Sequence, residues 1–592
     1  MAEIQNPNQQ GGGGGGDSRS LFTLMMVFVL MILAFQYFGP KKPQQTETQH
    51  PQQKTAPAQT DTAPAPGAAD DTSQPSKAGH TGAKTAPSSG PAVQAADATE
   101  TVVENELYRI TFTNRGAQVK SWVLKKYKAD DEKTPLDLVN QAAAPKFGLP
   151  LSLFTYDKDL KNQLNSALYV PSATGTLAAP ATLSFEYSSG GLVVQKTFRF
   201  DSSYVVHADV TVTRNGAPIT ALLQWPSGLG DQANVQEYAR SSFNQLESGK
   251  ATQVAAKKVA GGETLHGSFD YAGVSDMYFA AVFMPDVPAD TSVVTLHDTL
   301  GIPRTGGHSD QTDQVAILGA AVGTSGEGVH THIFAGPKLL DLLESVHTAS
   351  GATLEPVVSF GWWSWIAKPM LLVLRFFVDH GIRNWGWAIL ALTLILNVAM
   401  LPTRFMMMKS QIKMQRIQPM MDAIKAKYAK YKTTDPRRQE MNKEMFDLQR
   451  KEGVNMFGGC LPMLLQYPLL IGFYEMLEYA IELRQAHWLW LPDLSAPDPS
   501  HVLPVFFVVS MFLSQFFTPS PGMDQAQQRM MAFMMPAFFG FMVWNMGSGV
   551  ALYWAGSNLL GVGLQLAMNR TGMGREMRAM AAKRAAKRKG KK

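Results

Sequence analysis

Residues 382–402 read IRNWGWAILALTLILNVAMLP, an apolar run long enough to cross a lipid bilayer as a helix. Further apolar runs of similar length follow at 457–477, 502–518, 529–546 and 549–568. The loop 403–456 between the first two runs carries thirteen Lys and Arg against six Asp and Glu. Basic loops stay on the cytoplasmic side of a membrane, so this loop fixes the orientation of the runs around it. The sequence therefore predicts a polytopic α-helical membrane protein.

An earlier apolar run, LFTLMMVFVLMILAFQYF, occupies residues 21–38. No small-x-small cleavage site follows it, so we interpret it as an uncleaved first transmembrane helix. Residues 1–20 include six consecutive glycines and are expected to be a disordered cytoplasmic segment. Residues 39–100 are rich in Pro, Gln, Ala and Thr and are expected to form a disordered linker.

Residues 101–355 are predicted to form an all-β domain. Turn residues separate its short apolar or alternating segments, which lie at 107–112, 119–124, 182–187, 192–200, 204–213, 219–224, 277–284, 292–297 and 329–335. Many short strands between turns indicate a large β-sandwich. The region holds 19 basic and 26 acidic residues, which suits the side of the membrane opposite to the basic loop. Cys460 is the single cysteine, so the domain depends on its core without an intramolecular disulfide.

Residues 360–381 (FGWWSWIAKPMLLVLRFFVDHG) are apolar but contain Lys368, Arg375 and Asp379. We interpret them as an amphipathic helix on the outer membrane surface. Counting them as a span, with the N-terminus inside, would place the basic loop and the basic C-terminal tail, 569–592, outside the cytoplasm. The resulting prediction is six transmembrane helices with both termini cytoplasmic.

The basic loop 403–456 is predicted to be a helical hairpin. Its first helix is expected from Lys409 to Tyr431, kinked or restarted at Pro419, and Asp435 is expected to cap the second helix. The loop is rich in methionine, whose flexible side chain suits varied apolar partners. Candidates for capturing an apolar substrate segment are Met414, Met420, Met421, Met441 and Met445. The alternative is that these methionines only pack the hairpin.

Motifs for nucleotide binding or covalent chemistry are missing from the sequence. No Walker A, His-x-x-His, Cys-x-x-Cys or Gly-x-Ser-x-Gly pattern occurs, so we expect no nucleotide, metal or other cofactor and no enzyme activity. A secondary transporter with an external binding domain is the main alternative, but duplicated halves or broken paired helices are not evident. A membrane-bound carbohydrate enzyme would need paired carboxylates within 101–355.

Polar residues inside the apolar runs are the candidate functional residues. Thr393 and Asn397 are four apart and share one helix face. Gln466, Ser514 and Asn558 lie within later runs. Each alone is consistent with a hydrogen bond between helices. Together they predict a hydrated groove, because lipid does not satisfy buried polar groups.

Several stretches resemble one family. Gly458–Pro468 (GGCLPMLLQYP), Glu482–Ala486 (ELRQA) and Ser548–Trp554 (SGVALYW) closely resemble the YidC membrane protein insertases, in the Gram-negative form. The resemblance implies an inner-membrane chaperone and insertase with a five-helix core and a periplasmic β-supersandwich. It implies nascent membrane proteins, the ribosome and the Sec translocon as partners.

The resemblance also implies which residues line the groove. The family usually carries a positive residue five positions before the final proline of the first core span, where this sequence has Asn397. Arg404 lies beyond that proline and is expected near the membrane surface, so we expect the groove to depend on hydration more than on charge. The groove residues assigned are Thr393, Asn397, Gln466, Ser514, Tyr553, Trp554 and Asn558. The tail residues expected to contact the ribosome or anionic membrane lipids are Lys583, Arg584, Lys587, Arg588 and Lys589.

Overall fold

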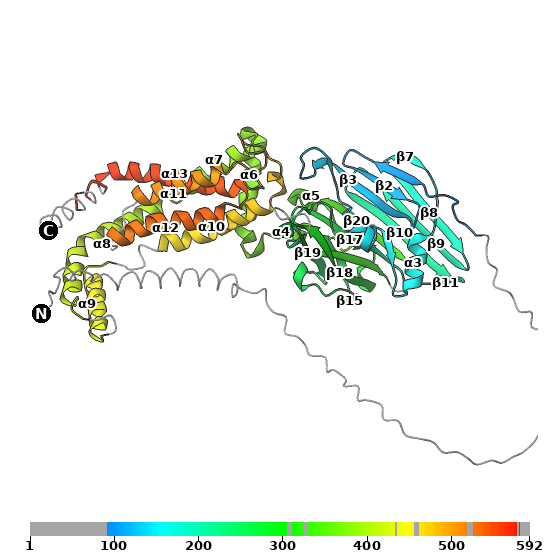
Figure 1. The fold of residues 1–592 in the computed structure, drawn as a ribbon, viewed down its shortest axis with the longest axis horizontal. Helices are drawn as coiled ribbons and strands as arrows, with labels where there is room; N and C mark the ends of the chain where they lie inside the picture. The colour runs from blue at the N-terminus through cyan, green and yellow to red at the C-terminus, as the bar shows by residue number, and fades with distance from the viewer. Residues whose placement is uncertain are drawn as a thin grey trace, which may run out of the picture.

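The computed structural model describes residues 92–304, 311–324, 328–431, 435–454, 461–517, 525–572, 574–576 and 579–580. A β-rich unit, residues 92–358 (the β-domain), and an elongated helical region, residues 360–580, lie end to end (Figure 1). The predictions for residues 1–20, for the first transmembrane helix 21–38, for most of the linker and for tail residues 581–592 fall outside the described residues.

The described part of the β-domain contains three sheets. The first has the strand order β4 (Pro135–Asp137), β3 (Gln118–Lys128), β2 (Tyr108–Thr113), β1 (Glu100–Glu104) and β7 (Gly175–Ala178). The second has the order β14 (Lys250–Ala255), β13 (Ser242–Glu247), β16 (Phe269–Ser275), β17 (Phe279–Pro285), β20 (Val329–Pro337), β10 (Val205–Arg214), β9 (Leu192–Phe200), β8 (Ala181–Ser189) and β6 (Val170–Pro171), with β11 (Ala217–Pro218) beside β10. The third has the order β15 (Thr264–Gly267), β18 (Thr291–Pro303), β19 (Thr312–Thr324), β12 (Leu222–Trp225) and β5 (Ser152–Phe154).

Burial along the strands differs between half-buried and fully covered strands. Strand β9 alternates between buried and exposed residues, as a half-buried strand should. Strands β16 and β17 are buried at every position, so they carry no alternation. All nine predicted strand segments overlap observed strands, whereas β13, β14, β16 and β19 have no counterpart in the prediction.

Lys196 is a buried cation in the core of the β-domain, 0% exposed. Its ammonium donates to the carbonyl oxygens of Gly116, Ala117 and Leu151 at 2.8, 3.1 and 2.9 Å. Burial lowers the pKa of Lys196 to about 7. The three N–H groups of an ammonium match the three carbonyls, so this side chain ties β9 to the turn before β3.

Short helices complete the β-domain. They are α2 (Ala144–Phe147), α3 (Lys158–Ser166), α4 (Val235–Tyr238) and α5 (Leu340–Ser345). The side chain of Asp157 caps α3 by accepting from the backbone N–H groups of Asp159 and Leu160.

The helical region consists of longer helices, most of which run roughly along the long axis of the molecule (Figure 1). They are α6 (Ser364–Phe377), α7 (Trp385–Ala399), α8 (Leu401–Lys427), α9 (Arg437–Lys451), α10 (Leu461–Tyr479), α11 (Val502–Phe517), α12 (Gln525–Val543) and α13 (Ser548–Arg570). Helices α8 and α9 form a hairpin at the end farthest from the β-domain (Figure 1).

A sharp bend of 117° separates α6 from α7. Arg383 adopts a left-handed conformation at the bend, with φ of 51°. Asn384 then caps α7 by accepting from the backbone N–H groups of Gly386 and Trp387. The predicted boundary between 360–381 and 382–402 coincides with this bend.

Each of the five predicted core spans overlaps a helix, from α7 and α10 to α13. Of the helices the structure describes, α13 is individually long and apolar enough to cross a membrane. The α6–α7 pair passes the same test only when both helices are taken together, and α11 and α12 have shorter apolar segments. The count of six spans stays a prediction.

The hairpin follows the predicted plan with one correction. Helix α8 continues through Pro419, where a kink or restart was expected, although proline removes one backbone hydrogen bond. Asp435 accepts from the backbone N–H of Arg437 at 2.9 Å at the start of α9. The predicted capping contact is therefore present.

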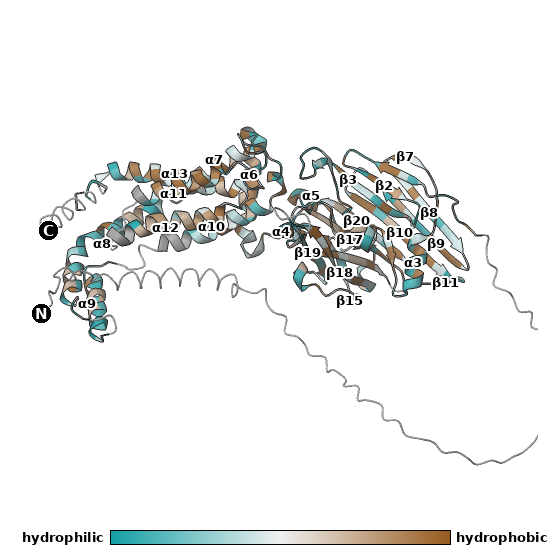
Figure 2. Cartoon of the chain, viewed as in Figure 1, coloured by the Kyte–Doolittle hydropathy of each residue, from teal (hydrophilic) through white to brown (hydrophobic). Residues whose placement is uncertain are grey.

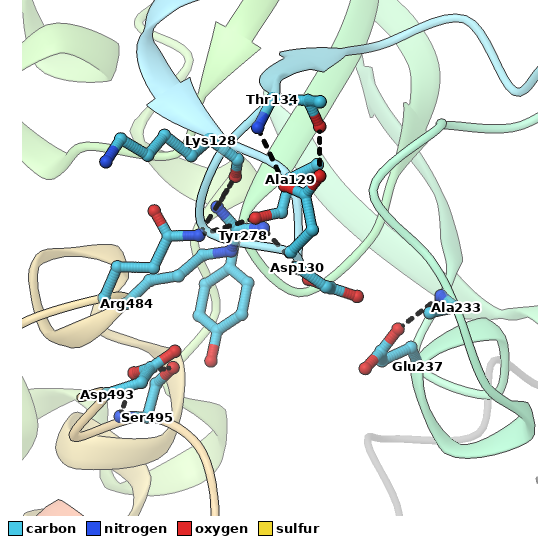
Figure 3. A network of polar contacts seen from close by, with 12 residues as sticks. Lys128, Ala129, Asp130, Thr134, Ala233, Glu237, Tyr278, Arg484, Asp493 and Ser495 are labelled. Carbon is cyan, nitrogen blue, oxygen red and sulfur yellow. Dashed lines mark hydrogen bonds and ion pairs between the residues drawn. The ribbon is translucent and has the colours of Figure 1, made fainter. Parts of the chain in front are cut away.

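Arg484, in the loop after α10, joins the helical region to the β-domain (Figure 3). Its side chain is 6% exposed and donates to the carbonyl of Lys128 at 2.8 Å and to Asp130 Oδ1 at 3.3 Å. Gln485 donates to the carbonyls of Lys128 and Ala129 at 3.1 and 2.9 Å. The end of β3 is thus fixed to this loop.

Two ion pairs and the apolar core reinforce this joint. Arg240 of the β-domain pairs with Glu478 of α10, and Arg375 of α6 pairs with Asp341 of α5 in the β-domain. One cluster of buried apolar residues runs from Val103 in the β-domain to Ala555 in α13. The two parts therefore share a continuous core.

Candidate substrate groove

Thr393 and Asn397 lie on one face of α7 and are both buried. Thr393 Oγ1 donates to the carbonyl of Ile389 at 2.6 Å, and Asn397 Nδ2 donates to the carbonyl of Thr393 at 2.9 Å. Such bonds to the preceding turn satisfy polar donors inside an apolar helix. Thr393 is therefore satisfied within its own helix, while Asn397 Oδ1 stays available to a neighbour.

Arg404 supplies that neighbour. Its Nη2 donates to Asn397 Oδ1 at 2.9 Å, and Asn397 Nδ2 donates to Ser557 Oγ on α13 at 3.3 Å. Gly561 of α13 lies beside the guanidinium, since a Cβ there would lie 3.4 Å from Arg404 Nη1, an ordinary contact distance. We call Asn397, Arg404 and Ser557 the polar cluster.

The polar cluster contains a contact that the sequence analysis did not predict. Arg404, which was expected beyond the proline and near the membrane surface, bonds to Asn397. It follows Asn397 by seven residues, or about two helical turns, so its long side chain reaches back along the same side of the helix. A positive charge therefore lies at Asn397 after all, supplied from α8.

A second polar contact lies between α11 and α13. Asn558 Nδ2 donates to Ser510 Oγ at 3.3 Å, and Ser510 Oγ donates to the carbonyl of Phe507 at 2.7 Å. Asn558 is turned about 100° from Ser557 around α13, so it faces α11 and not α7. Ser514 lies one turn further along α11 and is partly buried. The contacts of Asn397 and of Asn558 therefore lie on two different faces of α13.

The aromatic groove candidates pack helices together. Tyr553 is buried and stacks on Phe473 of α10, with ring centres 4.1 Å apart. The ring of Trp554 lies 5.7 Å from that of Phe507 and 6.2 Å from that of Phe539. Gln466 is exposed on α10, and none of its described contacts joins it to the polar cluster.

An apolar layer separates the polar cluster from the β-domain. Each of its residues is at most 4% exposed, and they are Ala388, Ile389, Leu392, Phe473, Met476, Leu477, Leu483, Leu494, Val550 and Leu552. Burial then falls along α13: between Gly556 and Ala567, all of which the structure describes, no residue is fully buried. Apolar residues mark α7, α10 and α11, whereas α8 and α9 are largely hydrophilic (Figure 2).

The hairpin methionines differ in exposure. Met421 is buried with Ile417 and Val454 in the hairpin core, and Met414 and Met445 pack against it. Met441 lies beside Arg438, with its sulfur 3.7 Å from Nη1. Met420 is 41% exposed. The structure also exposes apolar side chains that were not among the capture candidates, Met406 at 58% and Phe446 at 59%.

Comparison with known proteins identifies the chain. The family model described as the YidC periplasmic domain matches residues 100–373, and the model described as the 60Kd inner membrane protein matches residues 377–575. The membrane protein insertase YidC of Pelobacter propionicus is 31% identical over 580 residues, covering 94% of this chain and 99% of the relative. The chain belongs to the YidC family of membrane protein insertases.

Other proteins are also similar to this chain. The YidC insertase of Geobacter sulfurreducens is 30% identical over 487 residues, covering 78% of this chain and 85% of the relative. A solved structure titled an active YidC insertase with the first transmembrane domain resolved is 18% identical, with a TM-score of 0.34, and covers 82% of this chain and 96% of that chain. As a YidC family member, this chain is an inner-membrane insertase with a periplasmic, β-rich domain and a helical C-terminal region.

Proposed function

We propose that this insertase receives the polar flank of a new transmembrane segment at its polar cluster. The observation that carries the proposal is the guanidinium of Arg404, which is held by Asn397 and faces α13. Among the described residues, no carboxylate lies within 4.0 Å of it. A cation without an internal counter-ion attracts polar or acidic cargo and the water that accompanies it.

The neighbouring polar groups support passage of the cargo. Asn558 and Ser510 offer a second pair of polar side chains between α11 and α13. Local hydration lowers the cost of carrying a polar flank through lipid. The apolar part of the segment then moves into lipid, and its burial contributes about 25 cal/mol per Å². No ATP is consumed in this scheme.

The topology is part of the proposal. Six transmembrane helices, including 21–38, place both termini in the cytoplasm and the β-domain, as a supersandwich, in the periplasm. Helix α6 lies on the outer surface of the membrane. Its bend of 117° from α7 and its ion pair to Glu482 support this placement. The basic α8–α9 hairpin is then cytoplasmic.

The hairpin is the proposed capture surface for nascent membrane proteins. Exposed Met406, Met420 and Phe446 offer flexible apolar contacts, while Met421, Met414, Met441 and Met445 mainly hold the hairpin together. The basic tail around Lys583 is proposed to contact the ribosome or anionic lipids. The insertase acts alone or with the Sec translocon.

The test is depletion of this protein in its own bacterium, followed by protease mapping of a newly made, double-spanning membrane protein. Without the insertase, the loop that should reach the periplasm stays inaccessible to external protease. Parent protein restores access, and Arg404→Gln restores it poorly. Arg416→Gln is the matched control, because Arg416 lies on the same helix but is 60% exposed and pairs with Glu576. Equal rescue by both variants would remove Arg404 from the mechanism.

A further inference from the structure

Strand pairing in the ten-stranded sheet brings histidines and carboxylates together on one face. His207 of β10 lies directly opposite His332 of β20, and Asp209 lies opposite His330. Residues two apart on a strand share a face, so all four side chains stand on the same side. Asp286 follows β17, and its backbone N–H donates to the carbonyl of His330 at 3.0 Å, which fixes it beside them.

Three of these side chains converge on a single point. His207 Nε2 lies 3.2 Å from Asp286 Oδ2, and His332 Nδ1 lies 2.9 Å from Asp286 Oδ1. One ligand atom from each of the three residues lies within 4.8 Å of the others. Two imidazoles and one carboxylate are a ligand set that binds divalent transition metals, zinc among them.

One neighbour of the site is an arginine. Arg199 Nη1 donates to His207 Nδ1 at 2.9 Å, and its side chain is 57% exposed. Metal binding at Nε2 therefore requires this guanidinium to turn away from Nδ1, because Nδ1 carries the proton when Nε2 is a ligand.

The residues behind His207 suit a metal-bound imidazole. With Arg199 turned away, Nδ1 carries the proton when Nε2 coordinates a metal, and Asp209 Oδ2, 3.3 Å from Nδ1, is then within reach as its acceptor. Asp209 is itself held by Arg199 Nη2 at 2.7 Å and by His330 Nδ1 at 2.6 Å. A carboxylate that orients a ligating histidine is the usual outer support of a metal site.

A cavity gives access to the site. Asp286 and His332 line a cavity of about 460 Å³ that reaches His347 and the start of β10. A metal ion held by three protein ligands would keep its remaining position toward this cavity, for water or a small anion.

We propose that His207, His332 and Asp286 form a Zn²⁺-binding site on the β-domain, with Asp209 as a positioning residue. The bound ion would link β10, β20 and the end of β17. Nothing in this site is shared with the polar cluster of the helical region.

The test is Zn²⁺ titration of the full-length protein in detergent, without a polyhistidine tag and after removal of metal with a chelator. We expect one Zn²⁺ per chain at micromolar or lower concentration. His332→Ala and Asp286→Ala should weaken binding by more than a hundredfold, and Asp209→Asn by about ten- to a hundredfold. His266→Ala, on β15 and bonded to Ser292, is the histidine control and should bind as the parent does.

Two readouts keep the proposal falsifiable. Melting curves of the metal-free variants check folding, and they should match the parent because the side chain of His332 is 49% exposed. Co²⁺ in place of Zn²⁺ should give a visible absorption band that is lost in His332→Ala. Failure of the parent to bind Zn²⁺ below about 100 µM, or equal binding by parent and His332→Ala, overturns the proposal.

Discussion

Replacing Asn397 by leucine tests whether the polar cluster positions a charge. The substitution removes the acceptor that holds Arg404 Nη2 at 2.9 Å and the donor to Ser557 at 3.3 Å. Leucine is close to asparagine in size, so the helix packing is retained. The variant therefore separates loss of the contact from loss of the helix.

The hydrogen bond to the guanidinium sets the magnitude. Bonds that involve a charged group contribute about 1.5–3 kcal/mol, and about 1.4 kcal/mol corresponds to a factor of ten. The population with Arg404 held at the cluster should therefore fall by roughly ten- to a hundredfold. Insertion of a substrate with an acidic translocated loop should slow toward the rate of Arg404→Gln.

The assay is the initial rate at which a substrate loop becomes protease-protected in proteoliposomes containing the purified insertase. Paired substrates carry Asp and Glu, or Asn and Gln, in the loop. The insertion rate of the acidic substrate should fall more than that of the amide substrate. The double variant that combines Asn397→Leu with Arg404→Gln should insert the acidic substrate no more slowly than either variant alone. Parent-like insertion of the acidic substrate by Asn397→Leu, or fully additive effects of the two substitutions, would refute the reasoning.

Three further predictions concern stability. Lys196→Met leaves three carbonyls without their donor and should lower the free energy of unfolding by about 3 kcal/mol, measured by denaturation of the purified protein. Burial lowers the pKa of Lys196 to about 7, so as pH drops the unfolded chain binds this proton before the folded chain does. The free energy of unfolding should therefore fall as pH drops from about 10 to about 7. A parent-like pH slope in Lys196→Met would contradict this. Gly386→Ala places a Cβ 2.2 Å from Trp488 Cδ1 and should lower the melting temperature, whereas Gly563→Ala, with nothing within 4 Å, should not. Arg484→Gln should speed hydrogen exchange at the end of β3, and unchanged exchange would show that the apolar core alone holds the joint.

The sequence predicts the elements better than it predicts their partners. Apolar runs and the capping residue Asp435 are local signals, so the helices and the hairpin follow from them. Strand β16 lacks alternation because both of its faces are covered, and β19 consists largely of small residues. Neither pattern marks a strand by itself.

The sites depend on contacts between distant segments. The contact of Asn397 with Arg404 is implicit in their spacing of seven, whereas Ser557 is 160 residues away. Met420 and Met421 are neighbours with opposite exposure, which only the rotation of α8 against α9 decides. His207, Asp286 and His332 meet through the pairing of β10 with β20, a register that spacing along the chain does not encode.

The apolar layer beneath the β-domain has an electrical consequence. An inner membrane stores energy as a gradient of protons, and a water-filled path through it would discharge that gradient. Moving a bare ion through a layer lined by Ile389, Leu392, Phe473 and Leu552 would cost on the order of tens of kcal/mol. Under the proposed function, the polar cluster stays wet from the hairpin side while the layer insulates the two compartments. Substrate loops would then cross beside this layer, and the membrane would stay charged while proteins are inserted.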